Sequence, residues 1–346
     1  MTDSPGATSL DAHPLQRLRA LLADAHPPLD PAAWLRVLVA KECDRLALPG
    51  SGATLERWRA LACVGAADLS LAKLYEGHTD ALAILAELGG PDPIDGGLWG
   101  VWCAEPPAHR VELVVLPDGA TALRGAKAWC SGAASLSHAL VSGWNAAGEP
   151  CLAVVALRQA GVRLTDQGWR AVGMQASASV DVVFEDVPCV PVGNPGAYVH
   201  RPGFLHGGAG VAACWYGAMV GIARYLRDAL PADVADPHRL AHLGAVDVAV
   251  AQAGAVLREA AAQIDAQPRD DCALVCARAR LAVESAALQV MERTARALGA
   301  GPLCRDAWFA RMMADLPVFI RQSHAERDQA AHGSVVRNQE RAPWDL

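Results

Sequence analysis

The sequence lacks the features that mark several common classes of protein. Its 346 residues contain no long run of lysine or arginine and carry a formal net charge of −7, which argues against a surface that follows a nucleic-acid backbone. Residues 1–14 hold two aspartates and no apolar segment typical of a secretory signal peptide. The longest uncharged stretch, residues 207–223, is shorter than the roughly 20 residues of a membrane span, so we expect a buried helix there. We therefore expect a cytoplasmic protein with no nucleic-acid or membrane partner.

The cysteines also lack the spacing of a zinc site. Ten cysteines are scattered among apolar neighbours, and only Cys272 and Cys276 lie four residues apart on one face of an expected helix. No second pair of cysteines or histidines at zinc spacing accompanies them. Thiols stay reduced in the cytoplasm, so we expect these side chains to pack as small core residues and expect no metal site.

The spacing of apolar residues changes twice along the chain, and the 52% hydrophobic content is ample for a large core. Apolar residues recur at helical spacing from residue 14 to a cluster of glycine and proline at 89–97. Short β-branched segments separated by turn residues follow, as in a small antiparallel barrel or sandwich, and then the helical spacing returns. The predicted domains are an N-terminal helical domain (1–97), a central β domain (98–197) and a C-terminal helical bundle (198–346).

The most informative segment is residues 168–189, which read G-W-R-A-V-G-M-Q-A-S-A-S-V-D-V-V-F-E-D-V-P-C. Val180, Val182 and Phe184 alternate with other residues at a period of two, which predicts a strand over about 179–187 that ends at Pro188. The segment resembles the pattern W-x-x-x-G-M-x-x-S-x-S/T-x-x-V-x-F-x-D-V of the acyl-CoA dehydrogenase superfamily. That resemblance implies an α+β flavoprotein with an N-terminal helical domain, a central β-barrel domain, a C-terminal four-helix bundle and FAD as cofactor.

A second segment resembles the part of this family that contacts the flavin ring. Residues 123–133 read L-R-G-A-K-A-W-C-S-G-A, where the family has L-N-G-x-K-x-W-I-T-N-A. The resemblance implies that Trp129 packs on the ring and that the hydroxyl of Ser131 lies near the reactive N5 atom. The alternative is a core tryptophan beside a turn serine.

The segment after the glycine cluster resembles a third family motif but departs from it. Residues 101–110 read V-W-C-A-E-P-P-A-H-R, where the family has Y-x-x-T-E-P-x-A-G-S-D. The resemblance places Val101, Cys103 and Ala104 at the pyrimidine end of the flavin, and backbone N–H groups must replace the hydroxyl that alanine lacks at position 104. His109-Arg110-Val111 stands where the family has Gly-Ser-Asp, whose serine contacts coenzyme A. This departure argues against a coenzyme A substrate.

A glycine-rich turn near residue 300 suggests an oligomer. Gly299, Ala300 and Gly301 resemble a family loop that lets backbone approach the cofactor of a neighbouring subunit, and glycine suits such closeness because it has no Cβ. The resemblance implies a homodimer or homotetramer. An ordinary glycine cap at the end of a helix explains the same residues.

The residue that would act as base in a dehydrogenase is missing. Counting from Asp315, the family's glutamate falls on Ser323, so the nearest candidates are Glu326 as base and His324. Residues 323–328 also resemble the T-H-x-x-H-D tail of flavin monooxygenases built on the same fold, in which a histidine lies near the ring and a partner reductase supplies reduced flavin.

We therefore predict an FAD-dependent oxidoreductase that oxidises a CH–CH bond of an acyl thioester or a similar small molecule. Two alternatives stay open, namely a flavin-dependent monooxygenase and a catalytically silent scaffold member. The sequence does not identify the substrate, its carrier, or the electron acceptor or reductase.

Overall fold

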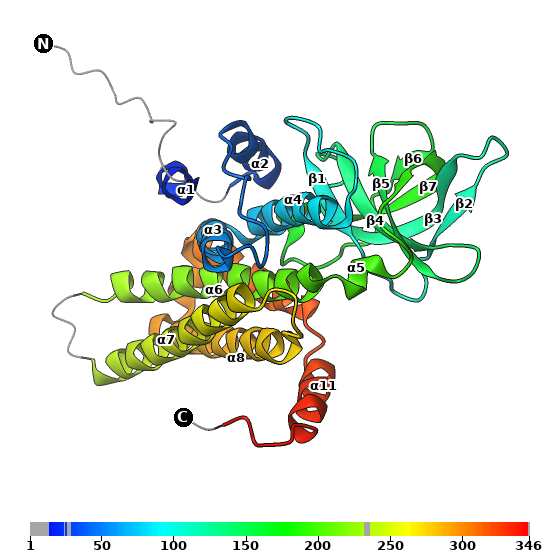
Figure 1. Cartoon of the computed structure of the whole chain (residues 1–346). Coiled ribbons are helices and arrows are strands. Elements are labelled where there is room, and N and C mark those ends of the chain that lie inside the picture. The colour runs from blue at the N-terminus through cyan, green and yellow to red at the C-terminus, as the bar shows by residue number, and fades with distance from the viewer. Residues whose placement is uncertain (1–13, 24, 26–28, 232–235, 345–346) are drawn as a thin grey trace, which may run out of the picture.

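The computed structural model describes residues 14–23, 25, 29–231 and 236–344. Helices from both ends of the chain pack into one body, and the β strands form a lobe beside it (Figure 1). This mixture of helix and sheet agrees with the α+β class expected from the sequence. The helices before the sheet are α1 (Pro14–Ala23), α2 (Pro31–Ala40), α3 (Thr54–Ala67) and α4 (Leu69–Leu88). Those after it are α5 (Ala197–His200), α6 (Pro202–Ala229), α7 (Pro237–Ala266), α8 (Ala273–Leu298), α9 (Ala300–Arg305), α10 (Ala307–Phe319) and α11 (Glu326–Arg337).

Helices α3 and α6 lie against each other and join the two ends of the chain in one hydrophobic core. Their close approach depends on glycine. A Cβ on Gly65 would lie 2.3 Å from the carbonyl oxygen of Cys214, and one on Gly217 would lie 2.0 Å from that of Ala62. Both distances are too short for any real carbon atom, so only glycine allows this contact between backbones. The predicted buried helix over 207–223 lies in α6, which contributes many side chains to the core.

Aspartate residues set the starts of the helices that surround the site. Asp68 caps α4 by accepting a hydrogen bond from the N–H of Leu71, and Asp306 caps α10 in the same way. Helix α4 ends at Gly89, whose φ of 65° is the left-handed conformation that glycine adopts at little cost. The glycine after α4 therefore turns the chain toward the sheet.

The sheet is mixed and curled, with strand order β6-β7-β3-β2-β4-β5-β8, and β1 pairs in parallel with β4. Strand β7 matches the strand predicted over 179–187. It pairs with β3, whose register shifts between Lys127 and Cys130. After this irregularity Cys130, the last residue of β3, pairs with Val180 at the start of β7. The strands are β1 (Trp99–Trp102), β2 (Val111–Val115), β3 (Thr121–Cys130), β4 (His138–Trp144), β5 (Pro150–Ala156), β6 (Val162–Leu164), β7 (Val180–Pro188) and β8 (Val190–Pro191).

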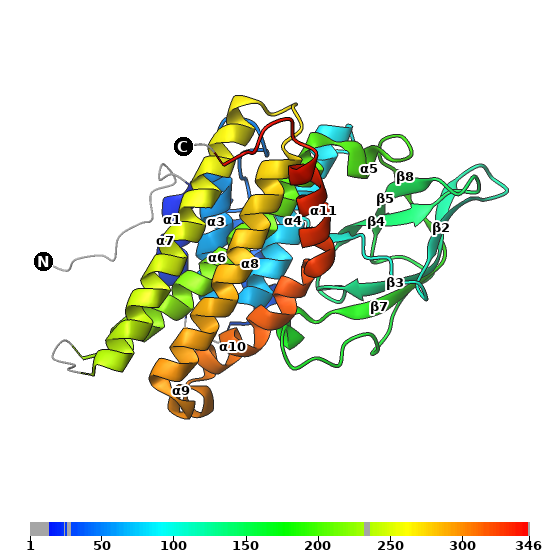
Figure 2. The ribbon, with the colours of Figure 1, turned by 90° about the horizontal axis from the view of Figure 1, so that it is seen from below.

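Helix α7 forms an outer face of the helical body, beside α8 (Figure 2). Among the described residues it is the one helix that is long and apolar enough to cross a membrane, with a mean hydropathy of 1.6. Only 28% of its most apolar part is buried. Its inner face packs against α8 and α6, so α7 is a bundle helix with an uncovered apolar side.

Candidate active site

A narrow cleft of about 10 Å³ lies where α4 meets β1 and the end of β3. Its lining combines a lysine, a serine hydroxyl, aromatic rings and small or apolar side chains. The lining residues are Lys73, Leu74, Gly77, Trp99, Gly100, Val101, Trp102, Ser131 and Leu136. The cleft thus contains Val101 and Ser131, two of the residues expected from the sequence to meet a flavin, and no carboxylate is present among its described lining residues.

Lys73 is the charged residue of this cleft. It lies on α4 with a side chain that is 20% exposed, and its Nζ is 3.4 Å from Oε2 of Glu76. The same ammonium lies 6.0 Å from the ring centroid of Phe319 on α10. Lys73 and Glu76 therefore form a largely buried ion pair between the sheet and the C-terminal helices. Sequence reasoning missed it, since one lysine in a long apolar helix gives no signal of which neighbour it faces.

Trp129 lies at the end of β3 and does not belong to the core. Its side chain is 49% exposed, and its φ of 57° is unusual for a bulky residue. The backbone N–H of Trp129 donates a 3.4 Å hydrogen bond to Oδ1 of Asp181. The alternative of a core tryptophan therefore fails. A large indole ring beside Ser131 is left uncovered, as a ligand wall would be.

Ser131 is held by contacts on both its backbone and its side chain. The indole Nε1–H of Trp102 donates to the carbonyl oxygen of Ser131 at 3.2 Å. The hydroxyl of Ser131 is 2.8 Å from that of Ser179, which is 2.8 Å from that of Ser177. Ser177 donates in turn to the carbonyl oxygen of Met174 at 2.7 Å. The serines of the 168–189 signature thus form a line that ends at Ser131.

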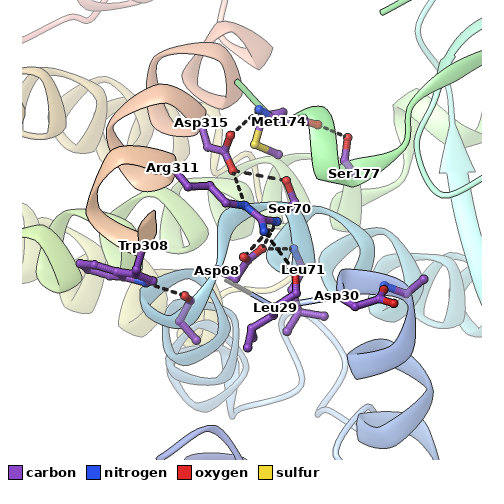
Figure 3. Close-up of polar contacts among 12 residues, drawn as sticks. Leu29, Asp30, Asp68, Ser70, Leu71, Met174, Ser177, Trp308, Arg311 and Asp315 are labelled. Atoms are coloured by element: carbon purple, nitrogen blue, oxygen red, sulfur yellow. Dashed lines mark hydrogen bonds and ion pairs between the residues drawn. The ribbon is translucent and has the colours of Figure 1, made fainter. Parts of the chain in front are cut away.

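A buried ion-pair network anchors this signature to the helices (Figure 3). The N–H of Met174 donates to Asp315 on α10, and Arg311 of the same helix pairs with Asp315 at 3.5 Å and with Asp68 at 3.0 Å. Ser70 on α4 donates to Asp315 at 3.3 Å. The network therefore joins the β lobe, the N-terminal helices and the C-terminal helices at one point.

Burial makes the two carboxylates of this network harder to ionise. Loss of solvation raises the pKa of Asp68 to about 6, and Arg311 and the N–H of Leu71 oppose this shift. Burial also raises the pKa of Asp315, against the hydrogen bond from Met174 and the charge of Arg311. Arg311 therefore favours the ionised form of both carboxylates, and for Asp315 the hydrogen bond from Met174 favours it more strongly.

Two of the family-like motifs meet in a second buried ion pair. Lys127 of the G-A-K-A-W segment has a side chain that is only 1% exposed, and its Nζ lies 3.4 Å from Oε1 of Glu105. Ser142 donates to the same carboxylate at 2.6 Å and Trp144 donates to it at 3.0 Å. Glu105 follows directly after Cys103 and Ala104 in the chain, so this pair fixes the loop that those two residues form at the end of β1.

The residues that replace Gly-Ser-Asp are engaged within the chain. His109 Nε2 lies 3.1 Å from Oδ2 of Asp181, and both residues line a hollow of about 580 Å³ on the sheet. The guanidinium of Arg110 lies 4.9 Å from the ring centroid of Trp144. Neither residue offers the hydroxyl contact that the family uses for coenzyme A.

Gly299 lies between α8 and α9, and Ala300 and Gly301 begin α9, at an end of the helical body away from the strands (Figure 2). Gly299 has a φ of 68°, and its N–H bonds to the carbonyl of Ala295 as an ordinary helix cap does. A Cβ on Gly299 or Gly301 would meet no atom within 4 Å among the described residues. Within one chain, the structure does not bring this turn to the cleft.

His324 and Glu326 lie at the start of α11 and both are exposed. The ring Nδ1 of His324 is 3.5 Å from Asp328, and its side chain is 63% exposed. Asp328 also accepts hydrogen bonds from the backbone N–H of His324 and from Ser323. The side chain of Ser323 itself is buried. In the described part of the chain, the cleft lining contains neither of the two predicted catalytic residues.

Comparison with solved structures identifies the fold. Methanesulfinate monooxygenase MsuC from Pseudomonas fluorescens is 20% identical at a TM-score of 0.79, with 95% of this chain and 98% of that chain covered. TdsC from Paenibacillus sp. A11-2, a dibenzothiophene monooxygenase whose structure holds FMN and indole, is 18% identical at 0.74, with 95% and 97% covered. The 3-HSA hydroxylase from Rhodococcus sp. RHA1 is 19% identical at 0.74, with 94% and 97% covered.

At these identities the likeness establishes the acyl-CoA dehydrogenase fold, as the sequence predicted. No protein-family model matches the sequence, and comparison with curated proteins gives no significant match. The prediction of CH–CH dehydrogenation was wrong, because the similar structures are those of monooxygenases and a hydroxylase. The physical reason for the error is visible at position 323, where a buried serine stands in place of the expected glutamate.

Proposed function

We propose that this chain is a flavin-dependent monooxygenase that binds reduced FMN at the end of β3, where Ser131 and the exposed Trp129 lie beside the narrow cleft between α4 and β1. The observation that carries the proposal is the chemistry of that cleft. It offers the cation of Lys73 and the hydroxyl of Ser131, without a carboxylate in the described lining to remove a proton from carbon. The likeness to MsuC and TdsC supports the same reaction class.

The residues at the end of β3 fit a flavin ring. The exposed indole of Trp129 supplies an aromatic wall, and Ser131 supplies a polar atom for the N5 edge. The backbone N–H groups of Cys103 and Ala104, at the end of β1, supply donors for the pyrimidine end. The fixed loop around Glu105 holds these N–H groups in place.

FMN suits this chain better than the FAD expected from the sequence. The structure of TdsC holds FMN.

The bound flavin and Lys73 then have separate tasks. When bound, the reduced flavin supplies two electrons to dioxygen, so that one oxygen atom enters the substrate and the other leaves as water. With flavin bound beside the cleft, the ammonium of Lys73, which is paired with Glu76, would stabilise negative charge that develops on the reduced ring and on oxygen. A separate flavin reductase supplies the reduced flavin.

A symmetric homo-oligomer also fits the structure. The outward side of α7 carries Leu240 and Val248, which are 47% and 54% exposed. An uncovered apolar face of this kind on a bundle helix marks an interaction surface. We propose that a second copy of the chain covers it, since the family resemblance already places Gly299–Gly301 at the cofactor of a neighbouring subunit.

The test uses the whole protein with photoreduced FMN under anaerobic conditions. Fluorescence titration should show binding, and mixing with ¹⁸O₂ and a panel of small sulfur and heteroaromatic compounds should give a product that contains ¹⁸O. Lys73→Met should slow product formation by about 10²-fold while the protein stays folded, because it removes the charge that stabilises developing anions. The matched control is Lys41→Met, at an exposed position at the end of α2.

Two outcomes contradict the proposal. One is a wild-type protein that binds neither reduced nor oxidised flavin. The other is anaerobic bleaching of bound flavin by an acyl-CoA, which would restore the dehydrogenase reaction.

A further inference from the structure

Three serine hydroxyls form a continuous line from the cleft into the interior. Ser131 lines the cleft, Ser179 lies next to it, and Ser177 lies between Ser179 and the carbonyl oxygen of Met174. Ser177 and Ser179 are 1% and 4% exposed, so bulk water does not reach them. The protein itself therefore decides which hydroxyl donates its proton to which neighbour.

Counting donors gives one direction for this line. A carbonyl oxygen can only accept, so the 2.7 Å contact at Met174 takes the single proton of Ser177. The contact between Ser177 and Ser179 then needs the proton of Ser179, and the contact between Ser179 and Ser131 needs the proton of Ser131. The reverse direction would leave two oxygen atoms 2.7 Å apart at Met174 with no proton between them.

The far end of the line is fixed as well. The N–H of Met174 is held by Asp315, which Arg311 holds in turn, so the carbonyl of Met174 keeps its place. The N–H of Gly132 donates to the carbonyl of Ser177 at 2.9 Å and ties the loop after β3 to the same turn. The hydroxyl of Ser131 therefore cannot turn its proton toward the cleft without breaking the line.

We propose that Ser177 and Ser179 are positioning residues that make Ser131 a hydrogen-bond acceptor, so that the cleft selects flavin in its reduced form. Reduced flavin carries a hydrogen on N5 that Ser131 can accept, whereas oxidised flavin has only a lone pair there. With oxidised flavin, a lone pair of the Ser131 oxygen would face the lone pair of N5, and their repulsion weakens binding of the oxidised ring. This inference rests on the proposed function, because it needs the N5 edge to lie beside Ser131.

The experiment measures the dissociation constants of reduced and oxidised FMN separately, together with the midpoint potential of the bound flavin. Wild type should bind reduced FMN more tightly. In Ser179→Ala the proton of Ser131 loses its acceptor, and in Ser177→Ala the hydroxyl of Ser179 can donate to Ser131 instead of accepting from it. In both variants the proton of Ser131 can turn to N5, so the preference for reduced FMN should fall by about two- to tenfold. The midpoint potential should fall with it, by about 30 mV for each tenfold change of a two-electron couple.

Two further variants separate this role from a structural one. Ser179→Thr keeps a hydroxyl and should restore the wild-type preference, and Ser135→Ala, in the turn after β3 but outside the line, should not change it. An equal loss of affinity for both flavin forms in Ser179→Ala and Ser177→Ala would overturn the inference and leave the monooxygenase proposal standing. Failure of wild type to bind either form would overturn both.

Discussion

Replacing Arg311 by methionine should destabilise the protein far more than loss of a surface ion pair. The guanidinium lies 3.0 Å from Asp68 and 3.5 Å from Asp315, and these two carboxylate side chains are only 2% and 3% exposed. It also donates to the carbonyl of Leu29 at 3.1 Å. Methionine keeps most of the aliphatic stem but leaves two buried carboxylates without their cation.

Removal of one partner from a buried ion pair costs about 3–5 kcal/mol. Arg311 is 20% exposed, so water can reach part of the vacated site and we expect about 3 kcal/mol at pH 8. The matched control is Arg296→Met, which removes the partner of Glu292. That pair is 62% and 57% exposed at 3.4 Å, so its loss should cost about 0–1 kcal/mol.

The loss of stability in Arg311→Met should depend on pH in a definite direction. Because burial raises the pKa of Asp68 to about 6, the folded protein takes up this proton more readily than the unfolded chain, whose aspartates titrate near 3.9. Protonation therefore favours the folded state as pH falls, and ionisation removes that stability as pH rises through about 6. Without Arg311 the pKa values of Asp68 and Asp315 rise further, so the gap between wild type and variant should be largest at pH 8 and narrow by pH 5.

Urea unfolding followed by circular dichroism and tryptophan fluorescence at several pH values between 5 and 8 measures this gap. A difference below about 1 kcal/mol at pH 8 would refute the assignment of Arg311 as the compensating charge. So would a gap that widens as pH falls, since protonated carboxylates need no cation.

Other predictions follow from the packing. Gly173→Ala should lower stability by about 1–3 kcal/mol in thermal unfolding, because its Cβ would lie 2.1 Å from the carbonyl oxygen of Ala314, whereas Gly333→Ala in α11 meets open space and should be neutral or stabilising. Equal unfolding temperatures for these two variants would contradict the tight contact between the signature and α10. Val248→Glu on α7 should reduce the oligomer mass measured by light scattering, while Val172→Glu, on a loop and 80% exposed, should leave it unchanged. A wild-type monomer would contradict the oligomer outright.

Local pattern was enough to predict much of the β lobe. The alternation of Val180, Val182 and Phe184 predicted β7. This prediction depends on neighbours within a few residues, where side-chain period and turn residues decide the outcome.

The contacts that complete the site come from distant parts of the chain. Asp68 and Arg311 are 243 residues apart, and Lys73 reaches the cleft only because α4 packs on β1. No periodicity or motif in the sequence predicts the ion pair between Asp68 and Arg311 or the packing of α4 on β1. The exposure of His324 and Glu326 could not be predicted from the sequence either, because it depends on where α11 packs against α8. Position in the sequence was enough to name candidate residues near the C-terminus, but it did not predict where their side chains lie in the structure.

The residues shared with the family pattern also explain why the fold was predicted well and the reaction was not. Gly173 and Met174 dock the β lobe on α10, and Ser177 and Ser179 line up the hydroxyl of Ser131. These tasks serve any enzyme that holds a flavin ring at this junction, whatever the ring then oxidises. The residues on which we base the proposed reaction lie outside the pattern: a buried serine stands at 323 in place of the expected glutamate, and Lys73 lines the cleft. A strong match to the signature is therefore informative about fold and says little about chemistry.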